Sequence, residues 1–287
     1  MPAALGFSMP AEWEPHEAAW LAWPHHPTDW PGKLDTIRWV YTEMVRKISP
    51  GETVRMLVRS VAEQKAAREY LVRAGADAGR VEFVAHPTNR SWTRDSGPVF
   101  VRRRVGGKSE TAIVHFHFNA WAKYQDWQKD RRVPETAARR LGKRLFHAQA
   151  NGRELVLEGG GIEVNGRGTL VTTEECYLDR KTQVRNPGLG RKDFETALKE
   201  YLGATNIFWL GGGVAGDDTH GHVDDICRFV DPTTVVLAKE TRRKDVNYRP
   251  LAENWERIRD FRLEDGSRPE VVALPMPAPL FCDGDRL

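Results

Sequence analysis

Three carboxylates stand at similar intervals along the chain, and each lies beside residues that favour turns. Asp95 lies in the segment WTRDSGP, Glu158 in LEGGG and Asp224 in GHVDD, with separations of 63 and 66 residues. Regular spacing of this kind indicates a repeat of similar structural units. Units arranged around an axis would bring the three carboxylates to one place, whereas three unrelated acidic turn residues are the alternative.

The densest polar cluster, residues 217–225, follows a run of three glycines and precedes an apolar segment. Because side chains two residues apart share one face of an extended strand, His222 and Asp224 are expected to point the same way and to share a substrate. An imidazole that titrates near neutral pH suits proton transfer. Two alternatives remain open: a solvated acidic loop, and a metal site in which His220, His222 and Asp224 bind zinc.

Asp95 follows Trp92 closely, and this pair suits a flat cation. A carboxylate can bind two guanidinium N–H groups at once, while an indole ring covers the face of the cation. The alternatives are an ion pair between Asp95 and Arg94 or Arg90, and simple packing for Trp92. Glu158 precedes three glycines, which allow a ligand or the backbone to approach closely.

A loop at residues 118–124, FNAWAKY, combines aromatic and polar side chains. Such a mixture is typical of one wall of a pocket. The substrate-binding candidates are therefore Trp92, Asp95, Glu158, Trp121 and Asp224.

Three segments predict β-hairpins, because short apolar strands flank turn-forming residues. They span residues 98–118, 154–173 and 222–238. In the second hairpin, Asn165-Gly166 suits the positive φ angles of a tight type I′ turn.

Apolar periodicity predicts helices between the strands. The predicted helices span residues 34–48, 62–73, 133–146, 191–202 and 248–261, and further strands span residues 19–23, 54–58, 81–85, 154–158, 206–210 and 271–275. Asp193 is expected to cap the helix that begins at residue 191. The alternation of helices and strands predicts a mixed α/β fold, in a single domain over residues 1–287.

The composition argues against several classes of protein. Lysine and arginine number 43 against 40 acidic residues, and a net charge of +3 gives no case for binding nucleic acid or an anionic membrane. No stretch approaches the roughly 20 consecutive apolar residues of a membrane span, and residues 1–10 lack the pattern of a secretory signal. The cytoplasm is the expected location. Cys176, Cys227 and Cys282 have no metal-type spacing and are expected to be reduced thiols.

Five segments resemble successive signature segments of the agmatine deiminase family, within the Porphyromonas-type peptidylarginine deiminases. They are MPAEWEPHEAAWLAWPHHPTDWP, SWTRDSGPVFV, FNAWAKYQDWQKDRRVP, LEGGGIEVNGRGTLVTTEECYL and GDDTHGHVDDICRFV. The resemblance runs from about Phe7 to the C-terminus, and five motifs in register are more specific than any one of them. It implies a five-module pseudo-symmetric α/β propeller, the pentein fold, with the active site on its axis, no cofactor and a homo-oligomeric assembly.

The resemblance also implies a role for each candidate residue. Asp95 and Asp224 would bind the guanidinium, while His222 would act as general acid and base. Glu158 would help to hold the substrate nitrogens, and Trp92 would stack nearby. The implied reaction hydrolyses agmatine to N-carbamoylputrescine and ammonia through a cysteine adduct, as a step in putrescine and polyamine biosynthesis.

The family nucleophile is a cysteine in a glycine-rich segment of the form GGGNIHC, and no segment of this sequence matches it. Cys176, Cys227 and Cys282 lie in other contexts and are not expected to take its place. We therefore expect that the last one and a half modules are missing and that this chain alone has little or no activity. The alternatives are a guanidinium-binding protein without catalysis, and a metal-dependent hydrolase that uses the His-x-His-x-Asp set described above.

Overall fold

The computed structural model describes residues 1–282 and 284–286, without the side chains of Cys282 and Asp285. Across these residues the strands form four three-stranded sheets and two short two-stranded sheets. The functional candidates all come from segments that enter or leave the larger sheets.

The first sheet is entirely parallel. Its strands are β1 (Ala18–Ala22), β2 (Thr53–Val58) and β3 (Val81–Ala85), paired in that order. Parallel pairing needs crossover connections, and α1 (Leu34–Ile48) and α2 (Val61–Arg73) provide them. Ser60 caps α2, because its side chain accepts a hydrogen bond from the backbone N–H of Glu63.

The other three sheets share one topology: an antiparallel pair of strands, then a helix, then a strand parallel to the second. The second sheet contains β4 (Val99–Val105), β5 (Lys108–His115) and β6 (Leu145–His147), with α4 (Val133–Leu141) before β6. The third contains β9 (Glu163–Val164), β10 (Thr169–Thr173) and β11 (Asn206–Leu210), with α6 (Arg191–Leu202) before β11. The fourth contains β12 (Cys227–Asp231), β13 (Thr234–Lys239) and β14 (Glu270–Pro275), with α7 (Tyr248–Arg257) before β14. The predicted repeat of mixed α/β units is thus confirmed for these three sheets.

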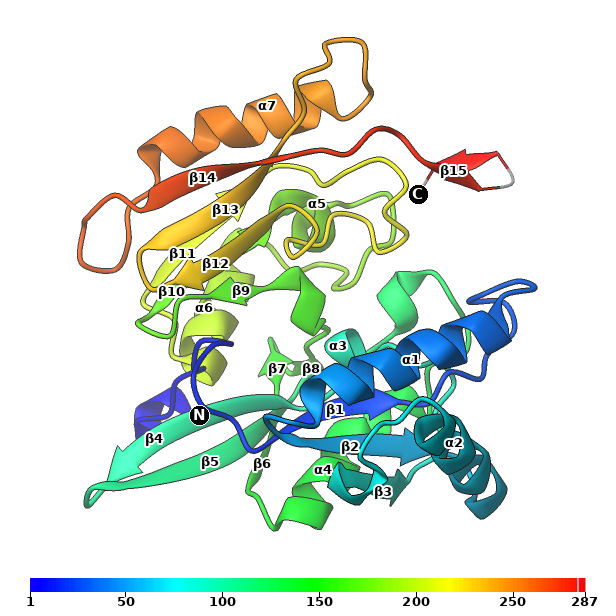
Figure 1. Ribbon diagram of the computed structural model, residues 1–287. Helices are drawn as coiled ribbons and strands as arrows, with labels where there is room; N and C mark the ends of the chain where they lie inside the picture. The colour runs from blue at the N-terminus through cyan, green and yellow to red at the C-terminus, as the bar shows by residue number, and fades with distance from the viewer. Residues whose placement is uncertain (283, 287) are drawn as a thin grey trace.

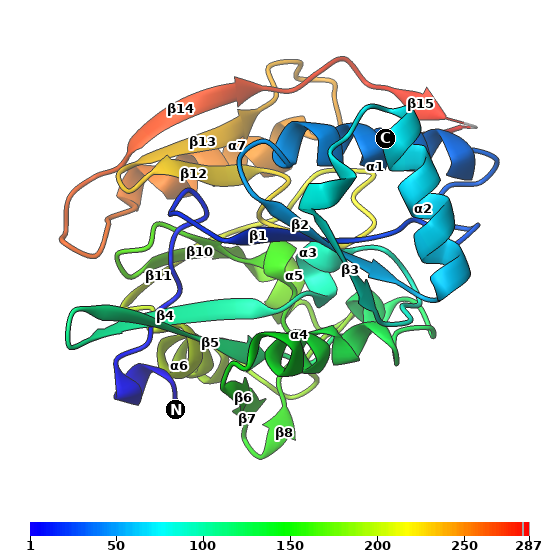
Figure 2. The same ribbon diagram turned by 60° about the horizontal axis from the view of Figure 1, so that its bottom comes forward.

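The remaining elements are short. They include α3 (Thr93–Ser96), α5 (Glu174–Leu178), β7 (Gln149–Ala150), β8 (Arg153–Glu154), β15 (Phe281–Cys282), β16 (Asp285–Arg286) and 3-10 turns at Ala120–Ala122 and Gly159–Gly161. Figures 1 and 2 show α2, α4 and α7 toward the periphery, with α3 and α5 near the middle of the molecule. Of the helices in the described residues, none has the length and apolar character needed to cross a membrane.

Most predicted elements are confirmed, several of them to the residue. The predicted bounds of α1, α6, β3 and β11 agree with the structure, and Asp193 caps α6 by accepting a hydrogen bond from the backbone N–H of Gly190. The helix predicted for residues 133–146 is wrong beyond Leu141. Gly142 adopts the left-handed conformation (φ 61°) that ends helices, and β6 follows.

The type I′ turn lies at a different Asn-Gly pair from the predicted one. Such a turn requires positive φ at both central residues. Asn151 and Gly152, between β7 and β8, meet this requirement with φ angles of 51° and 76°. At the predicted pair, Gly166 has a positive φ but Asn165 does not, so the prediction of a type I′ turn there is wrong.

Asn165 instead organises its loop through a buried side chain. Its Oδ1 accepts hydrogen bonds from the backbone N–H groups of Arg167 (2.9 Å) and Thr169 (3.0 Å). Its amide nitrogen donates to the carbonyl of Pro232 (3.1 Å) and to Glu264 (2.8 Å). The side chain therefore joins the β9–β10 hairpin to the fourth sheet.

A shared hydrophobic core joins the second and third sheets to α6. Phe7, Phe194 and Tyr201 are among its large side chains, and each is at most 2% exposed. Burial of such a side chain stabilises the fold by about 1.5–3 kcal/mol. Tyr177 stacks on Phe194 with ring centroids 4.4 Å apart, and its hydroxyl accepts a hydrogen bond from the backbone N–H of Glu158. The core thus fixes the backbone that carries this candidate residue.

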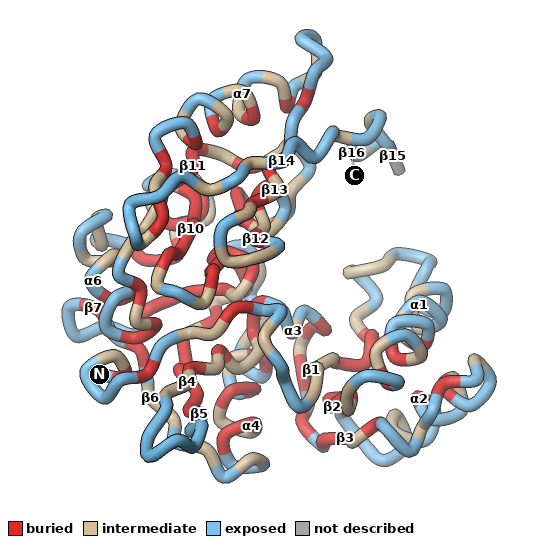
Figure 3. The backbone as a smooth tube through the Cα atoms, turned by 60° about the vertical axis from the view of Figure 1, so that its left-hand side comes forward, coloured by how far each residue is buried: buried red, intermediate tan, exposed pale blue. Residues whose placement is uncertain are grey.

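β14 is the edge strand of the fourth sheet, and it is largely exposed. Val272 and Leu274 are 42% and 54% exposed, and Figure 3 shows little buried backbone along this strand. An exposed apolar edge favours pairing with other strands. Self-association through this edge is therefore expected at high protein concentration.

Asn165→Asp is expected to destabilise the protein. The replacement turns two donated hydrogen bonds into contacts between a buried carboxylate and other oxygen atoms, so the free energy of unfolding should fall by about 3 kcal/mol. Urea denaturation followed by circular dichroism measures the change. Asn151→Asp, at the exposed Asn-Gly turn, is the matched control and should cost no more than about 1 kcal/mol. Equal losses for the two variants would contradict the role of Asn165.

Candidate active site

Four predicted residues converge at one buried position. Asp95 comes from α3, Glu158 precedes the turn at Gly159–Gly161, and His222 and Asp224 lie in the loop before β12. The Nδ1 atom of His222 is 3.8 Å from Oδ1 of Asp95 and 3.8 Å from Oδ1 of Asp224. Its Nε2 atom is 3.5 Å from Oε2 of Glu158. A single imidazole thus stands among three carboxylates.

The loop that carries His222 differs from the prediction. Residues 222–226 form turns, and β12 begins only at Cys227, so His222 and Asp224 do not lie on an extended strand. The loop is held by backbone hydrogen bonds, including one from the N–H of Asp224 to the carbonyl of Gly160 (3.2 Å). The two side chains still face the same point, but the turn and not strand geometry brings them there.

His222 is 97% buried, since its side chain is only 3% exposed. Burial alone would lower the pKa of His222, but the carboxylates of Asp95, Glu158 and Asp224 outweigh it and raise the pKa to about 9. The ring is therefore a cation at neutral pH.

Asp95 is buried and has a protein donor at each oxygen. Its Oδ1 accepts a hydrogen bond from the backbone N–H of Gly160 (3.0 Å), and its Oδ2 accepts one from Nε1 of Trp121 (3.0 Å). Burial and the nearby carboxylates raise the pKa of Asp95, while His222 lowers it. Each oxygen keeps a lone pair for a further donor.

The three glycines at residues 159–161 leave space that any side chain would fill. A Cβ atom on Gly160 would overlap Nδ1 of His222 and Oδ1 of Asp95. A Cβ on Gly159 would overlap the carbonyl of Arg94, and one on Gly161 would overlap the hydroxyl of Tyr177. The glycine run thus lets the backbone approach the polar cluster, as the sequence suggested.

Glu158 is fully buried and is paired with a residue that the sequence analysis missed. The Nε atom of Arg185 lies 3.3 and 3.4 Å from the two oxygens of Glu158, and both side chains are 0% exposed. Burial opposes the ionised form, but Arg185 and His222 outweigh it and lower the pKa of Glu158. Nothing in the local sequence around Arg185 marks it, because its partner lies 27 residues away.

Asp224 is paired with Arg94, which was expected only as a possible partner of Asp95. The Nε atom of Arg94 is 3.1 Å from Oδ2 of Asp224. Arg90, the other expected partner, pairs with Asp29 and Asp126 instead. The alternative of an ion pair at Asp95 with either arginine is therefore wrong.

The two candidate tryptophans take different positions. Trp121 is 4% exposed and donates to Asp95, whereas Trp92 is 41% exposed and packs against Trp30 with ring centroids 5.5 Å apart. Residues 120–122 all have positive φ angles, between 51° and 58°. Such conformations cost free energy in residues other than glycine and are concentrated at functional sites. The strain here places the indole of Trp121 against the carboxylate.

A cavity of about 280 Å³ opens onto this cluster at Asp95. Its lining combines aromatic rings with charged groups: Thr28, Asp29, Arg90, Trp92, Asp95, Trp121, Tyr124, Asp218 and Thr219. Asp218 is the more exposed acid, and it pairs with Lys123 and accepts a hydrogen bond from the hydroxyl of Tyr124 (2.6 Å). The sequence analysis placed Asp218 in the polar cluster but gave it no role.

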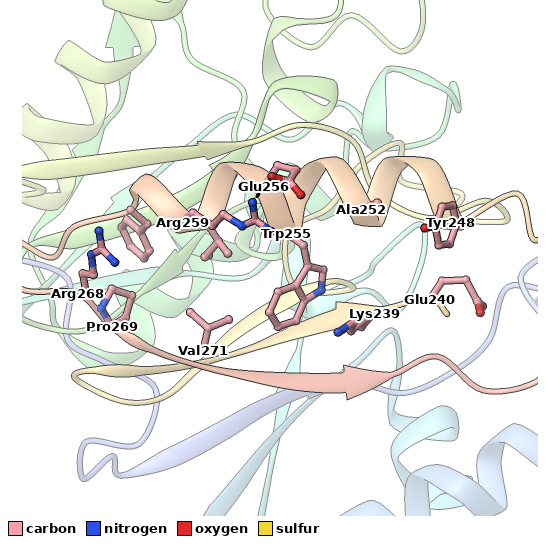
Figure 4. Close-up of a pocket in the computed structure, with 12 residues that line it drawn as sticks. Lys239, Glu240, Tyr248, Ala252, Trp255, Glu256, Arg259, Arg268, Pro269 and Val271 are labelled. Carbon is pink, nitrogen blue, oxygen red and sulfur yellow. Dashed lines mark ion pairs between the residues drawn. The ribbon is translucent and has the colours of Figure 1, made fainter. Parts of the chain in front are cut away.

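A larger hollow of about 540 Å³ lies elsewhere, between α7 and the β13–β14 pair. Figure 4 shows Trp255 projecting from α7 toward this sheet, beside Lys239. Its Nε1 donates to the carbonyl of Ala238 (2.9 Å), and the ammonium of Lys239 lies 5.0 Å from the ring centroid. These contacts fix a helix on a sheet, and none of the four candidate residues lines the hollow.

The predicted metal set does not come together. The Nε2 of His220 is 2.9 Å from Asp179, and its Nδ1 is 3.5 Å from Glu175, so His220 points away from His222 and Asp224. Among the described residues, the ligand-type atoms within 4.8 Å of one another are those of Glu158, Cys176 and His222. Because the Arg185 cation already faces both oxygens of Glu158, a second cation there would meet repulsion.

The two described cysteines are poor nucleophiles. Cys176 and Cys227 are both free and buried. Burial raises the pKa of the Cys176 thiol, and the neighbouring Glu158 carboxylate (3.9 Å) raises it further. Burial likewise raises the pKa of Cys227, inside β12. The side chain of Cys282 lies outside the described residues.

Comparison with known proteins identifies the family of the chain. The sequence profile of the Porphyromonas-type peptidyl-arginine deiminases matches residues 8–287. An agmatine deiminase of Pseudomonas aeruginosa is 34% identical over 293 residues, which cover 99% of this chain and 75% of that protein. An agmatine deiminase of Medicago truncatula is 36% identical over 294 residues, which cover 98% of this chain and 74% of that protein.

Solved structures lead to the same group. The agmatine deiminase of Enterococcus faecalis has a TM-score of 0.86 and 28% sequence identity to this chain, covering 99% of it and 77% of the solved chain. The profile match and the curated relatives cover almost the whole length of the sequence. This chain therefore belongs to the Porphyromonas-type peptidyl-arginine deiminase family, a family of hydrolases that act on carbon–nitrogen bonds of guanidino groups.

Proposed function

We propose that this chain provides the substrate-binding and proton-transfer part of an agmatine deiminase. The observation that carries the proposal is the position of His222 among Asp95, Glu158 and Asp224. Three carboxylates around one imidazolium can bind the guanidinium of a substrate in its place when the ring releases its proton. The relatives named agmatine deiminases support agmatine as that substrate.

Asp95 and Asp224 would bind the guanidinium nitrogens, and Trp92 would cover part of the cation within the cavity. Glu158 would accept a hydrogen bond from a further nitrogen. The primary amine of agmatine would then reach toward Asp218, whose side chain is 58% exposed at the outer part of the cavity. Free arginine carries a carboxylate at this end, and repulsion from Asp218 would disfavour it.

In the reaction, a cysteine thiolate attacks the guanidinium carbon and forms a tetrahedral adduct. His222 gives a proton to the departing nitrogen, and ammonia leaves an amidino-thioether. His222 then removes a proton from water, which attacks the same carbon and releases the carbamoyl product and the thiol. The carbamoyl group of the product is neutral, although its primary amine stays charged, so it no longer pairs with Asp95, Glu158 and Asp224 and its release is favoured.

Neither Cys176 nor Cys227 is proposed as the nucleophile, because burial raises the pKa of both thiols. The 287 residues alone are therefore proposed to bind agmatine without converting it. A five-module propeller, a homo-oligomer, a cytoplasmic location and a place in putrescine biosynthesis stay predictions from the family resemblance. The repeated sheets support the first of them.

Agmatine binding tests the proposed function directly. Titration calorimetry on the 287-residue chain should give a measurable Kd for agmatine and weaker binding for arginine. Asp224→Asn should weaken agmatine binding at least about tenfold, because one charged partner of the guanidinium is lost. Asp35→Asn removes an acid that is 79% exposed and pairs with Arg38, away from the site, so it is the control and should bind like the wild type. No heat of binding with the wild-type chain would refute the proposal.

Agmatine binding should also depend on pH. At pH 7 the His222 ring is charged, because its pKa is raised to about 9. A bound guanidinium would repel this charge and lower the pKa of His222, so binding should release a proton and grow tighter as the pH rises from 7 to 9. Calorimetry in buffers with different ionisation enthalpies counts the released protons. His222→Gln should bind with no such release, and equal proton release from this variant would exclude His222 as the source.

Turnover by the chain should be absent or very slow. Agmatine incubated with the purified 287-residue chain should release no more ammonia than a variant in which Cys176, Cys227 and Cys282 are all replaced by serine. An enzyme-linked ammonia assay measures this. Ammonia release that disappears in the triple variant would show that one of the three thiols reacts.

A further inference from the structure

Behind Asp224 lies a group of ion pairs that joins four separate segments. Arg94 contacts Asp224 through Nε (3.1 Å), pairs with Glu12 through Nη1, and lies 4.0 Å from Glu163 on β9. Arg228 on β12 pairs with the same two glutamates, Glu12 and Glu163 (2.8 Å). Glu12, in the N-terminal segment, therefore pairs with the guanidinium groups of both Arg94 and Arg228.

The position of Arg94 is fixed at its backbone. It precedes Asp95 in α3, and its carbonyl lies where a side chain on Gly159 would otherwise stand. The hydroxyl of Thr93 also donates to the carbonyl of Trp20 on β1 (3.0 Å). Movement of Arg94 is thus confined to its side chain. The guanidinium has three carboxylates within 4.0 Å, those of Glu12, Glu163 and Asp224.

Arg94 presents to Asp224 the same chemical group that the substrate would present. In the structure the Nε–H of Arg94 donates a hydrogen bond to Oδ2 of Asp224, while Oδ1 of Asp224 faces His222. Its Nη1 is bound by Glu12 and its Nη2 faces Glu163. An arginine without those two partners could bind a carboxylate through two parallel N–H groups, which is the stronger arrangement.

We propose that Arg94 is a positioning residue, which Glu12 holds so that it binds one oxygen of Asp224 and leaves the other for the substrate. The N-terminal segment thereby sets the affinity of the site for a guanidinium cation. The inference rests on the proposed function for its substrate, but the geometry of the ion pairs does not depend on it.

Removal of the Glu12 charge should weaken substrate binding although Glu12 does not contact the cavity. In Glu12→Gln the guanidinium of Arg94 loses the closer of its two glutamate partners, while Glu163 stays 4.0 Å away, and it turns to Asp224 with two N–H groups, competing with agmatine. Calorimetry should give a Kd about tenfold higher than that of the wild type. Glu12→Asp keeps the charge and should recover part of the affinity.

Glu14→Gln is the matched control. Glu14 lies two residues further along the same segment, and its carboxylate pairs with Arg102, which has no contact with Asp224. Loss of this one pair removes a partly exposed ion pair of the same segment, so the thermal stability of the control should fall no more than that of Glu12→Gln, which loses two. Its Kd for agmatine should stay at the wild-type value.

Arg94→Lys tests whether the planar shape of the guanidinium, and not only its charge, is needed to position Asp224. A lysine keeps the charge but is a point donor on a flexible stem, so it cannot hold Glu12 and Asp224 in the same fixed geometry. We expect agmatine binding several-fold weaker than in the wild type, without a matching loss of stability. Wild-type affinity in Arg94→Lys would mean that only the charge matters, and it would overturn the positioning role.

A second readout needs no agmatine. The charged groups that act on His222 are Asp95, Glu158, Asp224 and Asp225, and a guanidinium moved onto Asp224 offsets one of these charges. NMR titration of the His222 ring, assigned with His222→Gln, should show a pKa lower by about half a unit or more in Glu12→Gln and unchanged in Glu14→Gln. If the wild-type chain binds no agmatine, the proposed function fails, while this shift still supports the role of Arg94. An unchanged His222 titration in Glu12→Gln would overturn it.

Discussion

The placement of three carboxylates within 4 Å of one imidazole, two of them buried and Asp224 partly buried, is the constraint on which the rest of the structure depends. Isolated charges of one sign are costly in a protein interior, by several kcal/mol each. Each carboxylate is therefore given donors of its own: Trp121 for Asp95, Arg185 for Glu158 and Arg94 for Asp224. His222 supplies the remaining positive charge at the centre. The fold brings these donors together from segments far apart in sequence. The carboxylates are stabilised only when all of these donors are in place.

Local features of the chain were predictable from sequence because they depend on neighbouring residues. The bounds of α1 and α6 follow from apolar periodicity and from capping by Asp193. The hairpins follow from turn residues between apolar strands, and the spacing of Asp95, Glu158 and Asp224 indicated that the units repeat. The candidate carboxylates and His222 were therefore found from their residue types and intervals, and the structure brings all four together.

The partners of those residues could not be predicted, because they depend on how the sheets are arranged. Arg94 and Asp224 are 130 residues apart, and no local pattern links them. Arg185 lies in an irregular segment with no periodicity to mark it. The backbone also departs from simple rules: Asn165-Gly166 has the composition of a type I′ turn, but buried hydrogen bonds from the Asn165 side chain select another loop. Tertiary contacts decide such cases.

The glycine run at residues 159–161 has a consequence for how this sequence can vary. Its three members face three different neighbours: the carbonyl of Arg94, the His222–Asp95 pair and the hydroxyl of Tyr177. No single compensating change elsewhere could make room for side chains at all of them. Gly160 has no positive φ that would by itself demand glycine, so a survey of backbone angles would class it as replaceable. Excluded volume and not chain flexibility limits the run, and one methyl group on Gly160 would push the His222 imidazole away from Asp95.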